Sequence, residues 1–176
     1  YQPEAFLPSS GVYIEKDLQI NEEIEKLRLR ATSALMSGRS DVIIVASVSC
    51  IYGMGNPEEF ARNVVPIKVG DEISRNKILL SLVDIHYTRS DFSLERGNFR
   101  VKGDTVELYP AYADFAYRLF FWGDEIEDIH RFDPLTGKKL SGETAITIFP
   151  ANLFVTGKEL LHQSMSQIQD DLVKHV

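Results

Sequence analysis

Apolar and polar side chains alternate strictly along the stretch RGNFRVKGDTVELYP. Its centre, Gly103-Asp104, is a two-residue loop with glycine first, which is typical of a type II′ hairpin turn. Such a turn would place Val101 opposite Val106 and Phe99 opposite Leu108. Because successive side chains of a strand point to opposite sides, these four residues share one face. The pattern therefore predicts an antiparallel hairpin with an apolar face.

The other face of this hairpin is charged. The same register places Arg100 opposite Glu107 and Lys102 opposite Thr105. One interpretation is a solvated face with a surface ion pair worth less than about 1 kcal/mol. The other is a charged docking surface. The pattern taken alone favours the solvated face.

Further elements surround the hairpin. Asn56 and Pro57 are a typical N-cap and first helical residue, and a second helix should contain Ile78 and Leu82. Because only short loops separate the strands of period two, we expect these strands to pair antiparallel. Residues 58–150 should thus form a small α+β domain with two or three helices. The predicted strands are 85–88, 98–102, 105–109, 117–122, 125–130 and 145–149.

The preceding segment has a different character. Asn21 caps a helix that should end at Gly38. Residues 41–47, DVIIVAS, lack alternation and are typical of a strand buried on both faces of a parallel sheet. A helix followed by such a strand is half of an α/β unit, so the small domain is expected to be inserted into a partial α/β domain. The apolar stripe of the helix should consist of Ile24, Leu27, Ala31 and Leu35.

The two ends of the chain also carry signals. Thr156 and Glu159 form a capping box for a last helix. Its apolar stripe is Leu161, Met165, Ile168 and Leu172, which needs a partner surface. Near the other end, Tyr1, Phe6 and Tyr13 lie in a segment broken by prolines. Such aromatic side chains pack on a neighbouring core or stack on nucleobases, and both interpretations stay open.

Composition limits the functional classes. The chain has 176 residues and a net charge of −7, so any contact with nucleic acid must be local. One cysteine, Cys50, excludes an internal disulfide and fits a cytoplasmic protein. We find no signal peptide and no apolar run long enough to cross a membrane. Because the first residue is Tyr1 and not methionine, we expect an internal fragment of a longer protein.

Catalytic signals are weak. The sequence has no GxxxxGK[ST] loop and no GxGxxG turn, and its four histidines lack metal spacing. Ser47, Ser49 and Cys50 follow the predicted strand, but no nucleophile elbow or nearby histidine accompanies them. Asp124, Glu125, Glu127 and Asp128 are better explained as the solvated side of a turn and an edge strand. We therefore predict no catalytic residue, no metal site and no cofactor in this chain.

Several stretches, in this order, resemble the UvrB family, a subunit of the bacterial UvrABC excinuclease: YQPEAFLP, YIEKD, DVIIVASVSCIYGMGNPEEF, FRVKGDTVELYP, GDEIE and IFPANLFVT. The resemblance covers essentially the whole chain. It implies a helicase-like motor of the P-loop NTPase type that verifies damaged DNA in nucleotide excision repair. Such a protein receives DNA from UvrA, recruits the UvrC nuclease, and uses ATP and magnesium at motifs expected outside this chain.

The resemblance also implies a division of the chain. Residues 1–57 would belong to the motor domain and include the returning half of a DNA-probing β-hairpin. Residues 58–150 would be the UvrA-interaction domain, and residues 151–176 would return into the motor. UvrA-binding positions are then Arg89, Arg100, Lys102 and Arg118, and DNA-binding positions are Tyr1, Phe6, Tyr13 and Arg28.

Two positions depart from the family pattern. Lys102 stands in place of an arginine, which keeps the charge but loses the bidentate fork. Phe120 stands in place of a glutamate. Two alternatives remain: the UvrA-binding module of a transcription–repair coupling factor, and a fragment that mainly binds DNA. The direct sequence from YQPEA and YIEKD into the motor segment favours the UvrB family over the coupling factor.

Overall fold

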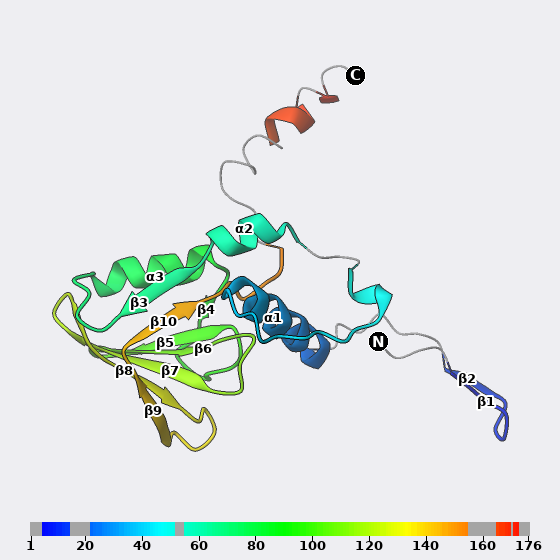
Figure 1. The fold of residues 1–176 in the computed structure, drawn as a ribbon, viewed down its shortest axis with the longest axis horizontal. Coiled ribbons are helices and arrows are strands. Elements are labelled where there is room, and N and C mark those ends of the chain that lie inside the picture. The colour runs from blue at the N-terminus through cyan, green and yellow to red at the C-terminus, as the bar shows by residue number, and fades with distance from the viewer. Residues whose placement is uncertain (1–4, 15–21, 52–54, 155–164, 170, 173–176) are drawn as a thin grey trace.

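The computed structural model describes residues 5–14, 22–51, 55–154, 165–169 and 171–172. A six-stranded sheet with the order β4-β5-β6-β7-β8-β9 forms its centre (Figure 1). All neighbouring strands from β5 onward pair antiparallel. The α+β class is confirmed. The strands are β4 (Thr88–Arg89), β5 (Asn98–Lys102), β6 (Thr105–Tyr109), β7 (Ala116–Trp122), β8 (Glu125–Phe132) and β9 (Lys139–Glu143).

The predicted hairpin is confirmed in its register. Val101 pairs with Val106, and Phe99 pairs with Leu108. Gly103 has a φ of +58°, which is the conformation that the first turn position of a type II′ hairpin requires. The alternation of apolar and polar residues therefore fixed both the pairing and the face that each side chain occupies.

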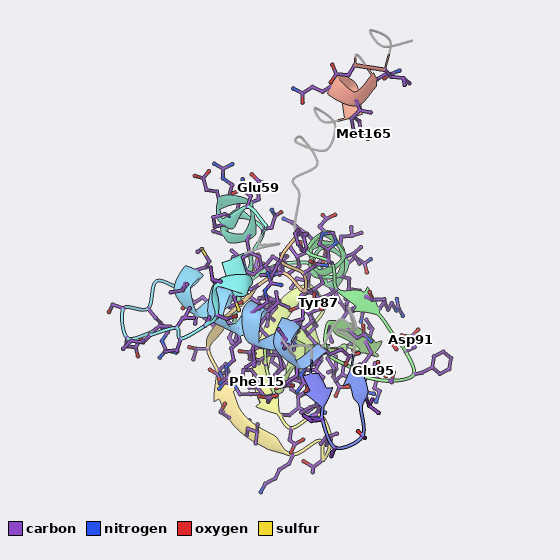
Figure 2. The ribbon with its side chains drawn as sticks, turned by 90° about the vertical axis from the view of Figure 1, so that its right-hand side faces the viewer. Glu59, Tyr87, Asp91, Glu95, Phe115 and Met165 are labelled. Carbon is purple, nitrogen blue, oxygen red and sulfur yellow. The ribbon has the colours of Figure 1, made fainter. Side chains whose placement is uncertain are left out.

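One pairing was predicted wrongly. β4 and β5 run parallel, with Thr88 opposite Asn98 and Arg89 opposite Phe99. Parallel strands usually need a long crossover because the chain must return along the full strand length. β4 has only two residues, so the loop 90–97 can make this short return. Asp91 and Glu95 lie on that loop (Figure 2).

One face of the sheet carries the hydrophobic core. Phe99, Val106, Leu108 and Leu119 are at most 1% exposed. They pack in one cluster with residues of α3 (Arg75–Asp84), β3 (Val65–Lys68) and β10 (Ala145–Ile148). β10 pairs antiparallel with β3 as a separate two-stranded sheet. We call this the inner face of the six-stranded sheet.

The chain turns sharply after α3. The amide of Tyr87 donates to the carbonyl of Leu82 and the amide of His86 to that of Val83, which is the Schellman pattern. His86 occupies the left-handed region with a φ of +69°. The predicted strand 85–88 is therefore wrong except for Thr88, because the helix cap takes up its first residues. β3 and β9 were not predicted.

Helix α2 (Pro57–Arg62) begins as expected. The side chain of Asn56 accepts a hydrogen bond from the amide of Glu58 at 2.9 Å. Next to this cap, a Cβ on Gly55 would lie 2.0 Å from the carbonyl oxygen of Leu153. The chain therefore enters the sheet domain at Gly55 and leaves it at Leu153, where the two backbones lie against each other. Only glycine, which has no Cβ, permits this close approach.

The segment before α2 differs from its prediction. Helix α1 (Glu22–Met36) forms, but its buried residues include Lys26 and Leu29, whereas Leu27 and Leu35 of the predicted stripe are about half exposed. The predicted strand 41–47 is wrong: its residues pair with no strand of the described chain, and most of them are exposed. A strand requires a neighbour to satisfy its backbone, and no such neighbour is described here. Residues 48–51 form the short 3₁₀ helix η1 (Val48–Ile51).

The N-terminal residues contain a small hairpin. β1 (Ala5–Leu7) and β2 (Val12–Ile14) pair antiparallel with each other. In Figure 1 this hairpin lies apart from the six-stranded sheet. Residues 165–169 and 171–172 are helical, and Met165, Ile168 and Leu172 are exposed. The predicted capping box and Leu161 lie outside the described residues.

Candidate protein-interaction face

Most of the residues predicted to contact a protein partner lie on the side of the six-stranded sheet opposite the core. We call this side the outer face. Three cross-strand rows on this face follow from the strand registers, because paired residues project to the same side. The first row runs through Arg100, Glu107, Arg118 and His130, the second through Lys102, Thr105, Phe120 and Asp128, and the third through Trp122 and Glu125.

Glu107 organises the first row. Its carboxylate is buried, with the residue only 3% exposed. The Nε atom of Arg100 donates to Oε2 at 2.5 Å, while Nε and Nη2 of Arg118 lie 2.8 Å and 2.5 Å from Oε1. Among the hydrogen bonds of the described residues, Glu107 accepts from Arg100 through Nε and not through its terminal nitrogens. Two guanidinium groups are thus held side by side over one carboxylate.

This arrangement fixes the charge of the row. Burial of the Glu107 carboxyl acts to raise its pKa, but the hydrogen bonds from Arg100 and Arg118 outweigh burial and hold the pKa below its ordinary value. Glu107 is therefore ionised at neutral pH. The two cations and one anion leave a net positive charge that the side chains, about a quarter exposed, present to solvent.

Aromatic rings support the outer face. The Cζ atom of Arg118 lies 4.4 Å from the ring centroid of Phe132, within cation–π range. Phe132 belongs to a small buried cluster with Tyr109 and Ala116, against which Leu94 of the loop 90–97 packs. The orientation of Arg118 is therefore set by a carboxylate on one side and a ring on the other.

The predicted UvrA-binding residues do not all lie together. Arg100 and Arg118 meet through Glu107, and Lys102 lies on the same face in the next row. Arg89 lies on the edge strand β4, in register with Phe99 of the inner face, and forms an ion pair with Asp91. Sequence reasoning recognised Glu107 as a partner of Arg100, but it missed the contact of Glu107 with Arg118. The three-strand register explains that contact.

The predicted DNA-binding residues fall in other parts of the chain. Phe6 and Tyr13 are paired positions of the β1–β2 hairpin. Arg28 lies half-buried on α1, and Tyr1 lies outside the described residues. The structure pairs Phe6 with Tyr13 in the backbone register of the hairpin.

A second ionic cluster ties α1 to the sheet domain. Asp114, on the loop after β6, contacts Lys26 at 3.2 Å and Arg30 at 3.6 Å, both from α1. Arg96 adds a contact of 2.6 Å. The hydrogen bonds from Arg96 and Lys26 hold the pKa of Asp114 below its ordinary value. Leu29 of α1 also packs in a buried cluster with Phe60, Phe149 and Leu153.

The hydroxyl of Ser47 lies 3.9 Å from the sulfur of Cys50 in the η1 turn. Within the described residues, no group of three or more His, Cys, Asp or Glu side chains could hold a metal ion. No helix within the described ranges has the length and hydropathy to span a bilayer.

The fold and the outer face define a small α+β interaction module, with a sheet covered on one side and a charged array on the other. Residues 65–154 match the model of the UvrB interaction domain, and the chain belongs to this family. Relatives named UvrABC system protein B support the same membership. Two of them match all of this chain: that of Cytophaga hutchinsonii is 62% identical, and that of Bacteroides fragilis 58%. That of Streptomyces avermitilis is 49% identical over 98% of the chain.

The chain spans about a quarter of the length of these relatives: 26% of the Cytophaga hutchinsonii and Bacteroides fragilis proteins and 24% of that from Streptomyces avermitilis. The match therefore covers one portion of each of these longer relatives. The residues that match the interaction-domain model, 65–154, lie within the matched portion.

Proposed function

We propose that this chain is the part of an excision-repair protein that docks onto UvrA, and that the outer face of the six-stranded sheet makes the contact. The observation that carries the proposal is the array of Arg100 and Arg118 on the buried carboxylate of Glu107. The terminal nitrogens left outside that contact suit a carboxylate of the partner. In this proposal the parent protein works in nucleotide excision repair with UvrA, UvrC and damaged DNA in the cytoplasm, and ATP and magnesium serve its motor.

The proposal is supported by the rigidity of the array. An arginine that enters an interface freely must lose side-chain entropy when it binds. Glu107 already holds Arg100 and Arg118 in one orientation, and Phe132 lies under Arg118. The ordering cost is therefore reduced before a partner arrives. Lys102 adds positive charge on the same face.

Titration of UvrA with the full-length parent protein tests the proposal. Arg100→Ala should weaken binding by about 30-fold, because truncating an interface arginine often costs about 2 kcal/mol or more. Arg62→Ala is the matched control, since Arg62 is an exposed arginine of α2 that pairs with Glu59 and lies off the sheet. Equal affinity of Arg100→Ala and the unmodified protein would refute docking through this face.

A second function, contact with DNA, is favoured by the β1–β2 hairpin. Phe6 and Tyr13 occupy paired positions, and aromatic side chains on an extended hairpin can stack on bases. Replacing both with alanine should weaken binding of a damaged duplex to the parent protein, with little change in the salt dependence. Fluorescence anisotropy measured across salt concentrations would show this. If the affinity of the double variant no longer depended on salt, the replaced residues would instead contribute to phosphate contacts.

A further inference from the structure

The central strand β7 continues the outer face beyond the arginine array. Side chains alternate along this strand, so Arg118, Phe120 and Trp122 project outward in sequence. Phe121 between them is 4% exposed and belongs to the core, whereas Trp122 is 79% exposed. Although the pairing with β8 shifts between Phe120 and Phe121, the alternation on β7 is maintained. One strand therefore carries a guanidinium and two large aromatic side chains on the same side.

Phe120 is held in place by its neighbours. Its ring packs edge-on against the imidazole of His130, with centroids 4.9 Å apart and an interplanar angle of 66°. Nε2 of His130 lies 2.5 Å from Oδ2 of Asp128 and 2.7 Å from Nζ of Lys139. Ring, imidazole and the two charged groups thus form a fixed network across β7, β8 and β9. A half-buried ring in such a setting offers its remaining surface without a large ordering cost.

Trp122 differs from the other exposed apolar residues by its position. Phe92 and Leu135 are almost fully exposed, but both lie on loops. Trp122 ends a strand in the middle of the sheet, where the amide of the preceding residue, Phe121, donates to the carbonyl of Asp104 at 2.9 Å. Single exposed apolar residues are common, but an indole at the end of a strand whose same face carries clustered arginines has the composition of an interface hot spot.

Positive and negative charges lie on different parts of the outer face. Arg100, Lys102 and Arg118 make one part of the outer face positive, while Asp124 and Glu125 flank Trp122 with negative charge. A partner with the complementary arrangement would present carboxylates to the arginines and cations to the turn. The docking orientation would then be defined by charge and not by contact area alone.

We propose that Phe120 and Trp122 form an apolar anchor that inserts into a pocket of the protein partner, flanked by carboxylates on one side and cations on the other. This inference rests on the proposed function and extends the contact from the arginine array to the end of β7. The partner pocket is expected to be lined by aliphatic or aromatic side chains, because the exposed indole surface is mostly apolar.

The test uses the full-length parent protein with UvrA. Trp122→Ala should weaken binding at least tenfold, and Trp122→Phe should restore part of the loss because it keeps an aromatic ring. Leu80→Ala is the control: Leu80 is 67% exposed but lies on α3, which packs on the inner face. Circular dichroism and thermal unfolding should be unchanged, since an exposed side chain contributes little to folding.

A spectroscopic measurement accompanies the titration. Trp122 is the only tryptophan in this sequence, so incorporation of 5-fluorotryptophan gives a direct probe, with Trp122→Phe identifying its signal in the longer protein. Addition of unlabelled UvrA should shift or broaden the fluorine signal of Trp122. Addition of single-stranded DNA, or an increase in protein concentration, should leave that signal unchanged.

The outcomes separate the two proposals. If Arg100→Ala weakens binding and Trp122→Ala does not, the docking face stands and the anchor is refuted. If neither variant changes affinity, docking through this face is itself wrong. If Leu80→Ala weakens binding as much as Trp122→Ala, the effect is not local and the anchor is refuted. A fluorine shift with DNA or with self-association, and none with UvrA, overturns the choice of partner.

Discussion

Replacing Glu107 with glutamine tests how much the charge of the buried carboxylate contributes to stability. Glutamine keeps the size of the side chain but removes the charge that holds Arg100 and Arg118. Removing one partner of a fully buried ion pair costs about 3–5 kcal/mol. Because both arginines are about a quarter exposed, water can replace part of the lost interaction. We therefore expect the free energy of unfolding to fall by about 2 kcal/mol.

Thermal unfolding provides the assay. For a chain of this size, about 2 kcal/mol corresponds to a decrease in Tm of about 4–8 °C. Asp91→Asn is the matched control, because Asp91 pairs with Arg89 while both side chains are more than half exposed. Its loss of stability should stay within about 0.5 kcal/mol. Equal stability of Glu107→Gln and the unmodified protein at neutral pH would contradict this reasoning.

The pH dependence gives an independent check with a defined sign. The pKa of Glu107 is lower in the folded state than in the unfolded chain, because the hydrogen bonds from Arg100 and Arg118 outweigh the effect of burial. Its stabilisation is therefore complete above the unfolded pKa and is lost as the pH falls through the folded pKa. The stability difference between the unmodified protein and Glu107→Gln should shrink as the pH is lowered from about 5 into that range. A difference that stays constant would refute the assignment.

Two further predictions concern the turn after α3. His86→Gly should raise the free energy of unfolding by about 0.5–1 kcal/mol because glycine adopts the left-handed conformation without strain, whereas His86→Ala should not; urea unfolding would distinguish them. Tyr87→Phe should cost about 1–2 kcal/mol, because the buried hydroxyl of Tyr87 donates to the carbonyl of Phe149 at 3.0 Å. Tyr112→Phe loses two longer contacts of 3.4 Å, one donated to the carbonyl of Thr147 and one accepted from the amide of Phe149, and should cost less in the same measurement.

The local part of the fold could be predicted because short-range patterns determine it. Alternation and the Gly103 turn specify the pairing of Val101 with Val106 without information from the rest of the chain. The cap of α2 is likewise local, since Asn56 bonds the amide two residues on. The outer face was predicted in part for the same reason: Arg100 and Glu107 belong to one hairpin.

The remaining features depend on distant contacts. The contact of Arg118 with Glu107 requires the register of a third strand, which the hairpin does not determine. The residues 42–46 have a strong strand pattern, but a strand forms only where a neighbouring strand accepts it. In α1 the buried side is set by Asp114 and Phe149 of the sheet domain, so Lys26 is buried where the hydrophobic pattern favoured Leu27.

The pairing of β3 with β10 has a consequence for synthesis of the protein. Val65 pairs with Ile148 and Lys68 with Ala145, so β3 leaves the ribosome about 80 residues before its partner. At about 5–20 residues per second this interval lasts about 4–16 s. The meander from β5 to β8 can assemble during that time because its strands are neighbours in the chain. If a ribosome stalls before residue 145, β3 lacks its partner strand. Its unpaired backbone edge could then pair with a strand of another nascent chain.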